Sequence, residues 1–505
     1  MRKEIFKLDE LQNHMMKLLC WRNFVFIFFG IILFNTASAQ SEWSPDSVLT
    51  RQQMLDDLDS LKKVIIASHP NPFAYYSADQ FENNFSELKI SIDSTSTMRA
   101  FTSKVASLIL PMRDSHTTID FFNLHRMCFA NDNYFLPINI YSSGDSILIE
   151  SDWEDFIPKG SRLISINGAD AMEVYRKSLE WSCIEGEAYT GQQRVADAIF
   201  PIVYAWHNTV LEENDMLVIP YGKSSQVSYF MKGYKKKEYQ RLNKLRSKQP
   251  SHQAVSFKFL EGDSIALLRV ATFAPANRNK YKRDIRSSFK KIKKHDCKYL
   301  VLDIRDNSGG SSGWVEYLYS FLDKTGYNTP SNVIGKNSEL AMQRSKGYNK
   351  GLSKLIINIF YKNDEDVQSF NRFARLPFGA SDTSYFTKPT LQKMRLVYSD
   401  KCVLLINGLT ASAGVDFTNQ FKRKQRGLIL GEPCLGPTSG TFGNPSSYKL
   451  PNSKIRVNIA TIRYNYDNSF VYEQSAIQPD VLIQATGANL FNKVDPAILY
   501  IQSNP

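Results

Sequence analysis

Ser412 stands at the point where an apolar, strand-like run gives way to a helical pattern. The run over 402–406 ends at Asn407 and Gly408, and apolar residues then recur at every fourth position from Ala413. A hydroxyl at a helix start lies beside free N–H groups and the positive end of the helix dipole, which suits helix capping and also oxyanion stabilisation. The pattern therefore predicts a cap or a nucleophile. The surrounding order Thr-Ala-Ser-Ala-Gly is not the G-x-S-x-G elbow of α/β-hydrolases.

A serine nucleophile needs a base, a group that orients the base, and N–H donors for the developing oxyanion. A glycine-rich turn, 306–310, follows the apolar run 299–304. Its flexible backbone could present the N–H of Gly309 or Gly310 beside that of Ala413. We therefore expect these three residues to form an oxyanion hole.

Four ordered motifs make the comparison with a known family specific. The segments VLDIRDNSGG, TASA, GEP and IQPDV occur in the order and approximate spacing of the C-terminal processing (tail-specific) peptidases, which the chain resembles over about 260–485. The resemblance implies a catalytic α/β domain with a mixed sheet, of the ClpP/crotonase-like kind, and serine peptidase activity.

The same resemblance implies which residue is the general base for Ser412. In the tail-specific branch the base is a lysine about two dozen residues after the serine, but this chain has a Gly-Pro step there, and proline cannot accept a proton. A second branch, resembling the tricorn core protease, uses a histidine preceded by a serine, and a glutamate shortly before the terminal Pro-Asp motif. Ser115, His116 and Glu473 match these positions. The resemblance implies that His116 takes the proton of Ser412, while Glu473, directly or through Ser115, holds the imidazole tautomer. Asp114 is a less favoured candidate for orienting His116.

The 505 residues, 43% hydrophobic and 22% charged, suffice for two or three globular domains. Apolar residues follow helical spacing in 44–126 and strand patterns from about 129 to 233. The phrase KGSRLISING followed by a short helix resembles the middle of a PDZ domain, whose expected role is peptide capture by strand addition, although 172–216 is longer than a minimal PDZ domain needs. We predict an α/β protein with an all-β module, divided into a signal peptide (1–39), a helical N-terminal domain (40–127), a PDZ-like domain (128–233), a basic linker (234–250), a catalytic domain (251–490) and a C-terminal tail (491–505).

The N-terminal segment predicts export. The apolar run 24–34 is too short to span a bilayer comfortably, follows basic residues, and precedes an A-x-A step that ends at Ala39. We expect cleavage after Ala39 and a periplasmic or extracellular protein, with an uncleaved membrane anchor as the alternative.

The charge and the cysteine content restrict the kinds of partner, metal and cofactor that we expect the chain to bind. The formal charge is +12, with basic residues concentrated in 232–248 and 278–298. Because no nucleic-acid module is recognisable, we interpret both clusters as solvated faces that favour weak, peripheral association with anionic envelope surfaces or acidic substrates. No C-x-x-C spacing is present, so we expect no metal and no cofactor. Cys297 and Cys402 are expected in the core, and one disulfide remains open.

The predicted function is an exported serine endopeptidase acting on polypeptides. The alternative is a non-catalytic protein that binds peptide or a lipophilic ligand on the same fold, which also resembles the repeats of a retinoid-binding protein of the eye. Gly414 and Val415 replace the Ser-Glu that often follows the nucleophile motif, outside the proposed proton path. We expect the insertion 326–393 to act as a cover, and the sequence leaves the oligomeric state open.

Overall fold

The computed structural model describes residues 44–93, 96–121, 123–124, 133–246, 253–260, 264–327, 330–345, 369, 371–386, 396–467 and 472–504. The predicted signal peptide and Cys128 lie outside these residues. In the described part of the chain, no helix combines the length and apolarity needed to cross a membrane.

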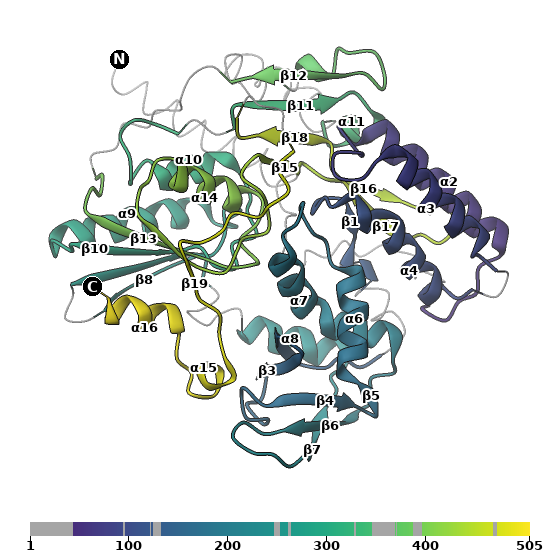
Figure 1. Cartoon of the computed structure of the whole chain (residues 1–505), viewed down its shortest axis with the longest axis horizontal. Coiled ribbons are helices and arrows are strands. Elements are labelled where there is room, and N and C mark those ends of the chain that lie inside the picture. The colour runs from purple at the N-terminus through teal and green to yellow at the C-terminus, as the bar shows by residue number, and fades with distance from the viewer. Residues whose placement is uncertain are drawn as a thin grey trace.

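A six-stranded mixed sheet forms the centre of the α/β domain (Figure 1), which confirms the predicted fold class. Five strands are parallel, and only the edge strand β8 runs antiparallel. Alternate strand residues face opposite sides, so Leu300 and Leu302 join the cluster with helices α9, α10 and α14, whereas Val301 packs with α16. Both faces are thus buried, as parallel sheets require. The elements are β8 (Val255–Leu260), β9 (Ile265–Val270), β10 (Tyr299–Asp303), β13 (Lys401–Ile406), β14 (Leu428–Gly431), β19 (Val481–Leu482), α9 (Arg278–Lys294), α10 (Ser312–Tyr319), α14 (Ala413–Arg423), α15 (Gly487–Phe491) and α16 (Pro496–Ser503).

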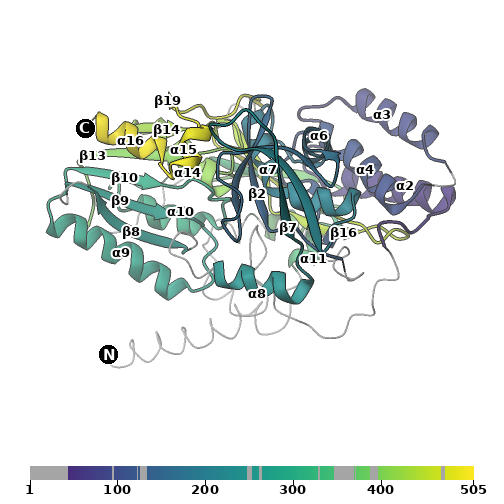
Figure 2. The same ribbon diagram turned by 90° about the horizontal axis from the view of Figure 1, so that it is seen from below.

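The N-terminal region is helical, as predicted. Thr50, Ser77 and Thr97 cap the first N–H groups of the three helices, because each hydroxyl accepts a backbone N–H from the first turn. These helices pack at one end of the molecule (Figure 2). They are α2 (Arg51–Ser68), α3 (Ala78–Ile90) and α4 (Met98–Ile109), followed by the 3-10 turn η1 (Leu110–Met112).

A separate antiparallel sheet, ordered β2-β3-β4-β6-β7, forms a module with α6 and α7. Asn167 and Gly168 adopt positive φ angles of 50° and 79° and turn the chain from β4 toward α6. The strand, Asn-Gly turn and helix that suggested a PDZ domain are therefore present, and the PDZ-like assignment stays a prediction. The elements are β2 (Ile138–Ser143), β3 (Ser146–Asp152), β4 (Arg162–Ile166), β5 (Ala169–Asp170), β6 (Glu213–Ile219), β7 (Val227–Lys232), α6 (Ala171–Trp181) and α7 (Tyr189–His207), and α8 (Lys236–Arg246) follows.

Two small antiparallel sheets join distant parts of the chain. Strand β1, directly after His116, pairs with β17, which places Thr118 opposite Asn458. The described part of 326–393 adds β11 and β12 to a sheet with β18 and β15. The elements are β1 (Thr118–Ile119), β16 (Ser446–Lys449), β17 (Arg456–Ile459), β11 (Asn332–Lys336), α11 (Glu339–Ser345), β12 (Ser381–Tyr385), β15 (Gly440–Gly443) and β18 (Ile462–Asn465).

Replacing Asp57 with alanine should destabilise the fold. Its buried carboxylate accepts the N–H groups of Asn452 (2.7 Å) and Ser453 (2.8 Å), so α2 is tied to a turn near the C-terminus. Losing both bonds should lower the free energy of unfolding by about 2–3 kcal/mol, measured by urea denaturation. The exposed neighbour Asp56 provides the control, and an Asp57→Ala midpoint equal to that of Asp56→Ala would contradict this role.

Candidate active site

Ser412 has a backbone conformation that is rare for a residue with a side chain. Its φ is 52° and its ψ is −119°, and it precedes α14 without capping the helix through its side chain. Such conformations cost on the order of 1–3 kcal/mol and cluster at functional sites. The Ser412 hydroxyl instead lies 3.2 Å from Nε2 of His116. Of the two predicted roles, the geometry therefore does not support the cap.

The segment 407–412, here called the Ser412 loop, is held by the loop that follows β10. The N–H of Ala411 donates to the Asn307 carbonyl (3.0 Å), and the Thr410 hydroxyl donates to the carbonyl of Ile304 (3.1 Å). The carbonyl of Thr410 accepts the N–H of Leu435 (2.9 Å). These bonds provide the surroundings that maintain the strained serine.

Asp114 organises the loop that carries His116. Its carboxylate accepts the N–H of His116 (2.8 Å) and the hydroxyl of Thr117 (2.5 Å), and it lies 2.9 Å from Nε2 of His69. Nδ1 of His69 accepts the N–H of Asn71 (3.2 Å), so Nε2 is the donor to Asp114. Burial alone would raise the pKa of Asp114, but the hydrogen bond from His69 and the neighbouring groups outweigh it and lower the pKa. Asp114 thus fixes the backbone of the loop.

Ser115 determines which nitrogen of His116 carries the proton. Its hydroxyl donates to Oε2 of Glu185 (2.7 Å) and lies 3.2 Å from Nδ1 of His116. A hydroxyl has one proton, so the contact with His116 requires an N–H on Nδ1. Nε2 is then left with a lone pair directed at the hydroxyl of Ser412, which is the tautomer that a general base needs.

Glu185, in the connection between α6 and α7, was missed by the sequence analysis. Its fully buried carboxylate also accepts the N–H groups of Ser115 (3.0 Å) and Phe442 (3.1 Å) and pairs with Nη1 of Arg463 at 3.4 Å. A buried carboxylate requires such a set of donors. Oε2 of Glu185 lies 3.9 Å from Nδ1 of His116.

The structure brings Ser115, His116 and Ser412 together but does not bring Glu473 to His116. The Glu473 side chain is exposed and accepts the hydroxyl of Thr438. In the described part of the chain, the acids within 4.0 Å of the His116 ring nitrogens are Asp114 and Glu185. The structure thus places Glu185, and not Glu473, beside the Ser115–His116 pair.

The contacts of the neighbouring residue, Gln474, explain why the Glu473 segment lies near the site while the Glu473 carboxylate does not. The carbonyl of Gln474 accepts the N–H of Glu187 (2.7 Å), and its side chain accepts Arg113 (3.1 Å). Gly186 has a φ of 57°, and a Cβ there would lie 2.4 Å from the carbonyl oxygen of Gln474. Close backbone packing between these loops thus brings Gln474, not Glu473, to the site. An acid next to a glycine, in a stretch longer than a PDZ domain needs, was the only sequence signal for Glu185.

Gly309 packs directly against the serine, because a Cβ there would lie 2.7 Å from Cβ of Ser412 and 2.8 Å from the nitrogen of Ala413. Its own N–H donates to the Asn307 side chain (2.9 Å). Among the described residues, the N–H groups of Gly310 and Ala413 have no acceptor. Of the three predicted oxyanion donors, two are therefore available.

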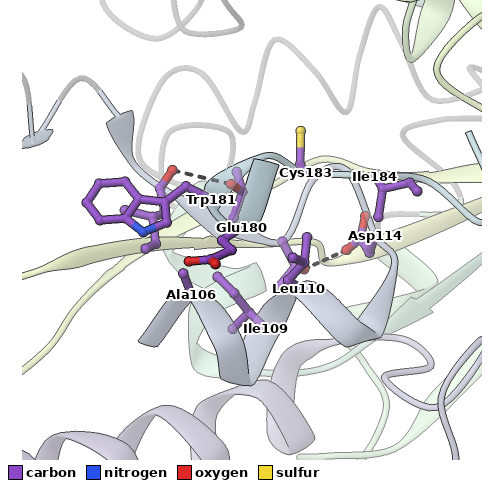
Figure 3. Close-up of a pocket in the computed structure, with 11 residues that line it drawn as sticks. Ala106, Ile109, Leu110, Asp114, Glu180, Trp181, Cys183 and Ile184 are labelled. Carbon is purple, nitrogen blue, oxygen red and sulfur yellow. Dashed lines mark hydrogen bonds between the residues drawn. The ribbon is translucent and has the colours of Figure 1, made fainter. Parts of the chain in front are cut away.

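Asp114, His116 and Glu185 offer donor atoms within 4.8 Å of one another, a set that could hold a metal ion. The hydrogen bonds described above already use these carboxylates. The same loop lines a small cavity (Figure 3), with Asp114 and Trp181 on opposite sides and Cys183 between them. The cavity volume of about 10 Å³ is near the lower limit for a single water molecule. The cavity is therefore too small to bind a substrate.

All four cysteines in the described residues are free and buried. Cys297 and Cys402 lie in the core, as predicted. Burial raises the pKa of Cys183 to about 12, which makes this thiol a poor nucleophile.

Comparison with known proteins gives a family match and similar solved structures. Residues 264–483 match the model described as peptidase family S41. Mature CPAF has a TM-score of 0.59 at 13% identity, with 90% of this chain and 96% of that chain covered, and mature CPAF complexed with lactacystin has 0.58 at 13%, with 90% and 97% covered. The photosystem II D1 C-terminal processing protease has 0.42 at 14%, with 86% and 93% covered. No curated protein sequence matches.

The CPAF comparisons show the fold, and the family model shows the class: the chain is a serine-type peptidase. Residues 264–483 belong to peptidase family S41.

Asp416 is a buried acid in the first turn of α14, four residues after Ser412. Its Oδ1 has no hydrogen-bond partner among the described residues. Burial raises the pKa of Asp416 to about 7, partly opposed by the hydroxyl of Tyr327 and assisted by the charge of Glu316. The neutral form of this acid is thus the form that the fold favours.

Asp416→Asn should change the pH dependence of stability. Because the folded-state pKa of Asp416 is raised, its contribution to the free energy of unfolding of the wild-type chain is fully present below about pH 4. This contribution is lost as the pH rises through about 7. Relative to wild type, Asp416→Asn should gain up to about 4 kcal/mol between pH 4 and pH 8, measured by urea unfolding. Asp400→Asn, at an exposed site, should show no such trend. A constant difference between Asp416→Asn and wild type across this range would refute the assignment.

Proposed function

We propose that this chain is a serine endopeptidase that hydrolyses polypeptides through an acyl-enzyme, with Ser412 as nucleophile and His116 as general base. The observation that carries the proposal is the 3.2 Å contact between Oγ of Ser412 and Nε2 of His116, whose Nδ1 lies 3.2 Å from the hydroxyl of Ser115. Nε2 takes the hydroxyl proton as Oγ attacks the peptide carbonyl carbon. The protonated imidazole then gives this proton to the leaving amine, and a water molecule activated by His116 hydrolyses the ester.

The N–H groups of Ala413 and Gly310 are the proposed oxyanion donors. Ala413 is the first residue of α14, where the helix dipole adds positive potential for an anionic oxygen. Gly309 serves this arrangement indirectly, because its lack of a Cβ lets the turn approach Ser412.

Glu185 acts on the base through Ser115. Its carboxylate accepts the hydroxyl of Ser115, and this hydroxyl accepts Nδ1–H of His116, so the tautomer is fixed by two consecutive bonds. When the imidazole becomes charged during catalysis, the carboxylate at 3.9 Å stabilises it. Glu185 is thus proposed as a positioning residue.

Export and domain division complete the proposal. The apolar run 24–34 and the A-x-A step ending at Ala39 support a signal peptide and a periplasmic or extracellular site of action. The substrate is a polypeptide, in keeping with the peptidase family of 264–483. The proposed boundaries remain those drawn from the sequence.

A fluorophosphonate should form a covalent adduct with the wild-type chain, detected by intact mass. Ser412→Ala should give no adduct, and His116→Ala should label about 10²- to 10⁴-fold more slowly.

Each outcome of this experiment is decisive. No adduct on folded wild-type protein at any pH from about 5 to 9 would favour the non-catalytic binding protein instead. Labelling of His116→Ala at the wild-type rate would show that another group is the base.

The two glutamates can be separated by isosteric substitution. Glu185→Gln should lower the labelling rate roughly 10- to 10³-fold, because a neutral amide can neither fix the Ser115 hydroxyl in the same way nor stabilise the imidazolium. Glu473→Gln, at an exposed side chain, should label within about twofold of wild type. Equal losses in both variants, or a loss confined to Glu473→Gln, would reverse the assignment. Circular dichroism and thermal unfolding of both variants provide the folding control.

A further inference from the structure

The β2 edge of the β2–β7 module is occupied at Ser142 by the chain's own side chains. Strand β2 lies at the end of its sheet, with β3 on one side. The outward N–H of Ser142 donates to Oδ1 of Asp197 (3.1 Å), and its carbonyl accepts Nη2 of Arg194 (3.1 Å). Strand addition needs these two groups free. Both side chains come from α7, which packs along β2.

Arg194 also joins the module to the α/β domain. Its Nε lies 3.1 Å from both carboxylate oxygens of Glu432, in the GEP motif after β14. The guanidinium lies 3.6 Å over the ring of Tyr141, whose hydroxyl donates to Oε1 of the same Glu432 (2.9 Å). Arg194 is 6% exposed and Glu432 4%, so water does not substitute readily for either partner.

The same side chain supports the start of the Ser412 loop. A Cβ on Gly408 would lie 2.6 Å from Cγ of Arg194, which shows that the arginine stem fills the space above this glycine. The N–H of Gly408 lies 3.5 Å from Oε2 of Glu432. One arginine therefore contacts the β2 edge, the GEP glutamate and the loop that ends in Ser412.

We propose that Arg194 is a positioning residue for the Ser412 loop, and that holding this loop and opening the β2 edge to a peptide are mutually exclusive. A strand added at Ser142 must displace the Arg194 guanidinium, which leaves Glu432 without its main partner and Gly408 without its packing. The module then serves as a clamp on the Ser412 loop, and its β2 edge does not capture a peptide while the clamp is closed. This inference rests on the proposed role of Ser412.

Hydrogen exchange of the full chain, followed by mass spectrometry, tests the coupling directly. In Arg194→Lys, the single ammonium cannot hold Ser142 and Glu432 at once. Segments 138–143 and 407–411 should then exchange faster together, by about tenfold or more, while β10 is unchanged. Arg176→Lys, on the exposed face of α6 in the same module, should alter neither segment. Faster exchange at 138–143 with unchanged exchange at 407–411 would overturn the proposal.

Glu432→Gln changes the partner of Arg194 in the α/β domain. It tests the proposal if Arg194→Lys does not fold. It should accelerate 407–411 to a similar extent, and the double variant should add little, because both changes break one network. Additive effects of the two changes on 407–411 would contradict a shared clamp.

A second readout separates positioning from general stability. Fluorophosphonate labelling of Arg194→Lys should slow about 5- to 20-fold with the pH midpoint of wild type, because the base and its orienting groups are untouched. A shifted midpoint would place the effect on His116 and overturn the proposal. Hydrogen exchange needs no activity, so absence of wild-type labelling would refute the proposed function alone, whereas an unaffected loop would refute the clamp alone.

Discussion

The contact between Ser412 and His116 is the constraint that the rest of the structure serves. The two side chains are 296 positions apart in sequence, and their reacting atoms meet at 3.2 Å. A hydrogen bond tolerates only a few tenths of an ångström and modest misalignment. Each partner must therefore be fixed by its own surroundings before the two can meet.

The two sides are fixed by different means. Ser412 is held by backbone geometry, since a strained conformation is maintained between β13, α14 and the loop after β10. Strained backbone conformations of this kind persist at functional sites where the surrounding contacts hold them in place. His116 is held by a hydrogen-bond chain that ends on the buried carboxylate of Glu185 and on Arg463. A chain of this kind also selects the tautomer, which packing alone could not do.

The sequence predicted the parts of the site that depend on local structure. The change from strand to helix made Ser412 a candidate cap or nucleophile, and the mixed sheet was expected from the family resemblance. His116 and Ser115 could be found only through the family resemblance, because nothing in the local pattern distinguishes a Ser-His pair in a short loop.

Glu185 and Arg194 could not be predicted for a physical reason. Their importance comes from contacts with residues more than two hundred positions away in the second half of the chain, such as Arg463 and Glu432. Burial of such charges is favourable only when the partners from both halves are in place, and no periodicity records that requirement. Glu473 shows the opposite case. Its position matches the glutamate of the family branch, but in the fold the neighbouring Gln474 makes the contact with Arg113, and the Glu473 carboxylate lies at the surface.

The division of the site between two parts of the fold has a mechanistic consequence. Ser412 and the proposed oxyanion N–H groups come from the α/β domain, whereas the proposed base, His116, comes from the N-terminal part and Glu185 from the module that precedes the family-matched segment. Residues 264–483 alone would contain the proposed nucleophile without the proposed base or the proposed positioning carboxylate. The proposed mechanism therefore requires docking of the N-terminal half, and the buried ion pairs Glu185–Arg463 and Arg194–Glu432 lie across that docking surface. Separating the halves would break both pairs and would also remove His116 and Glu185 from Ser412, so loss of docking would be coupled to loss of the proposed active arrangement.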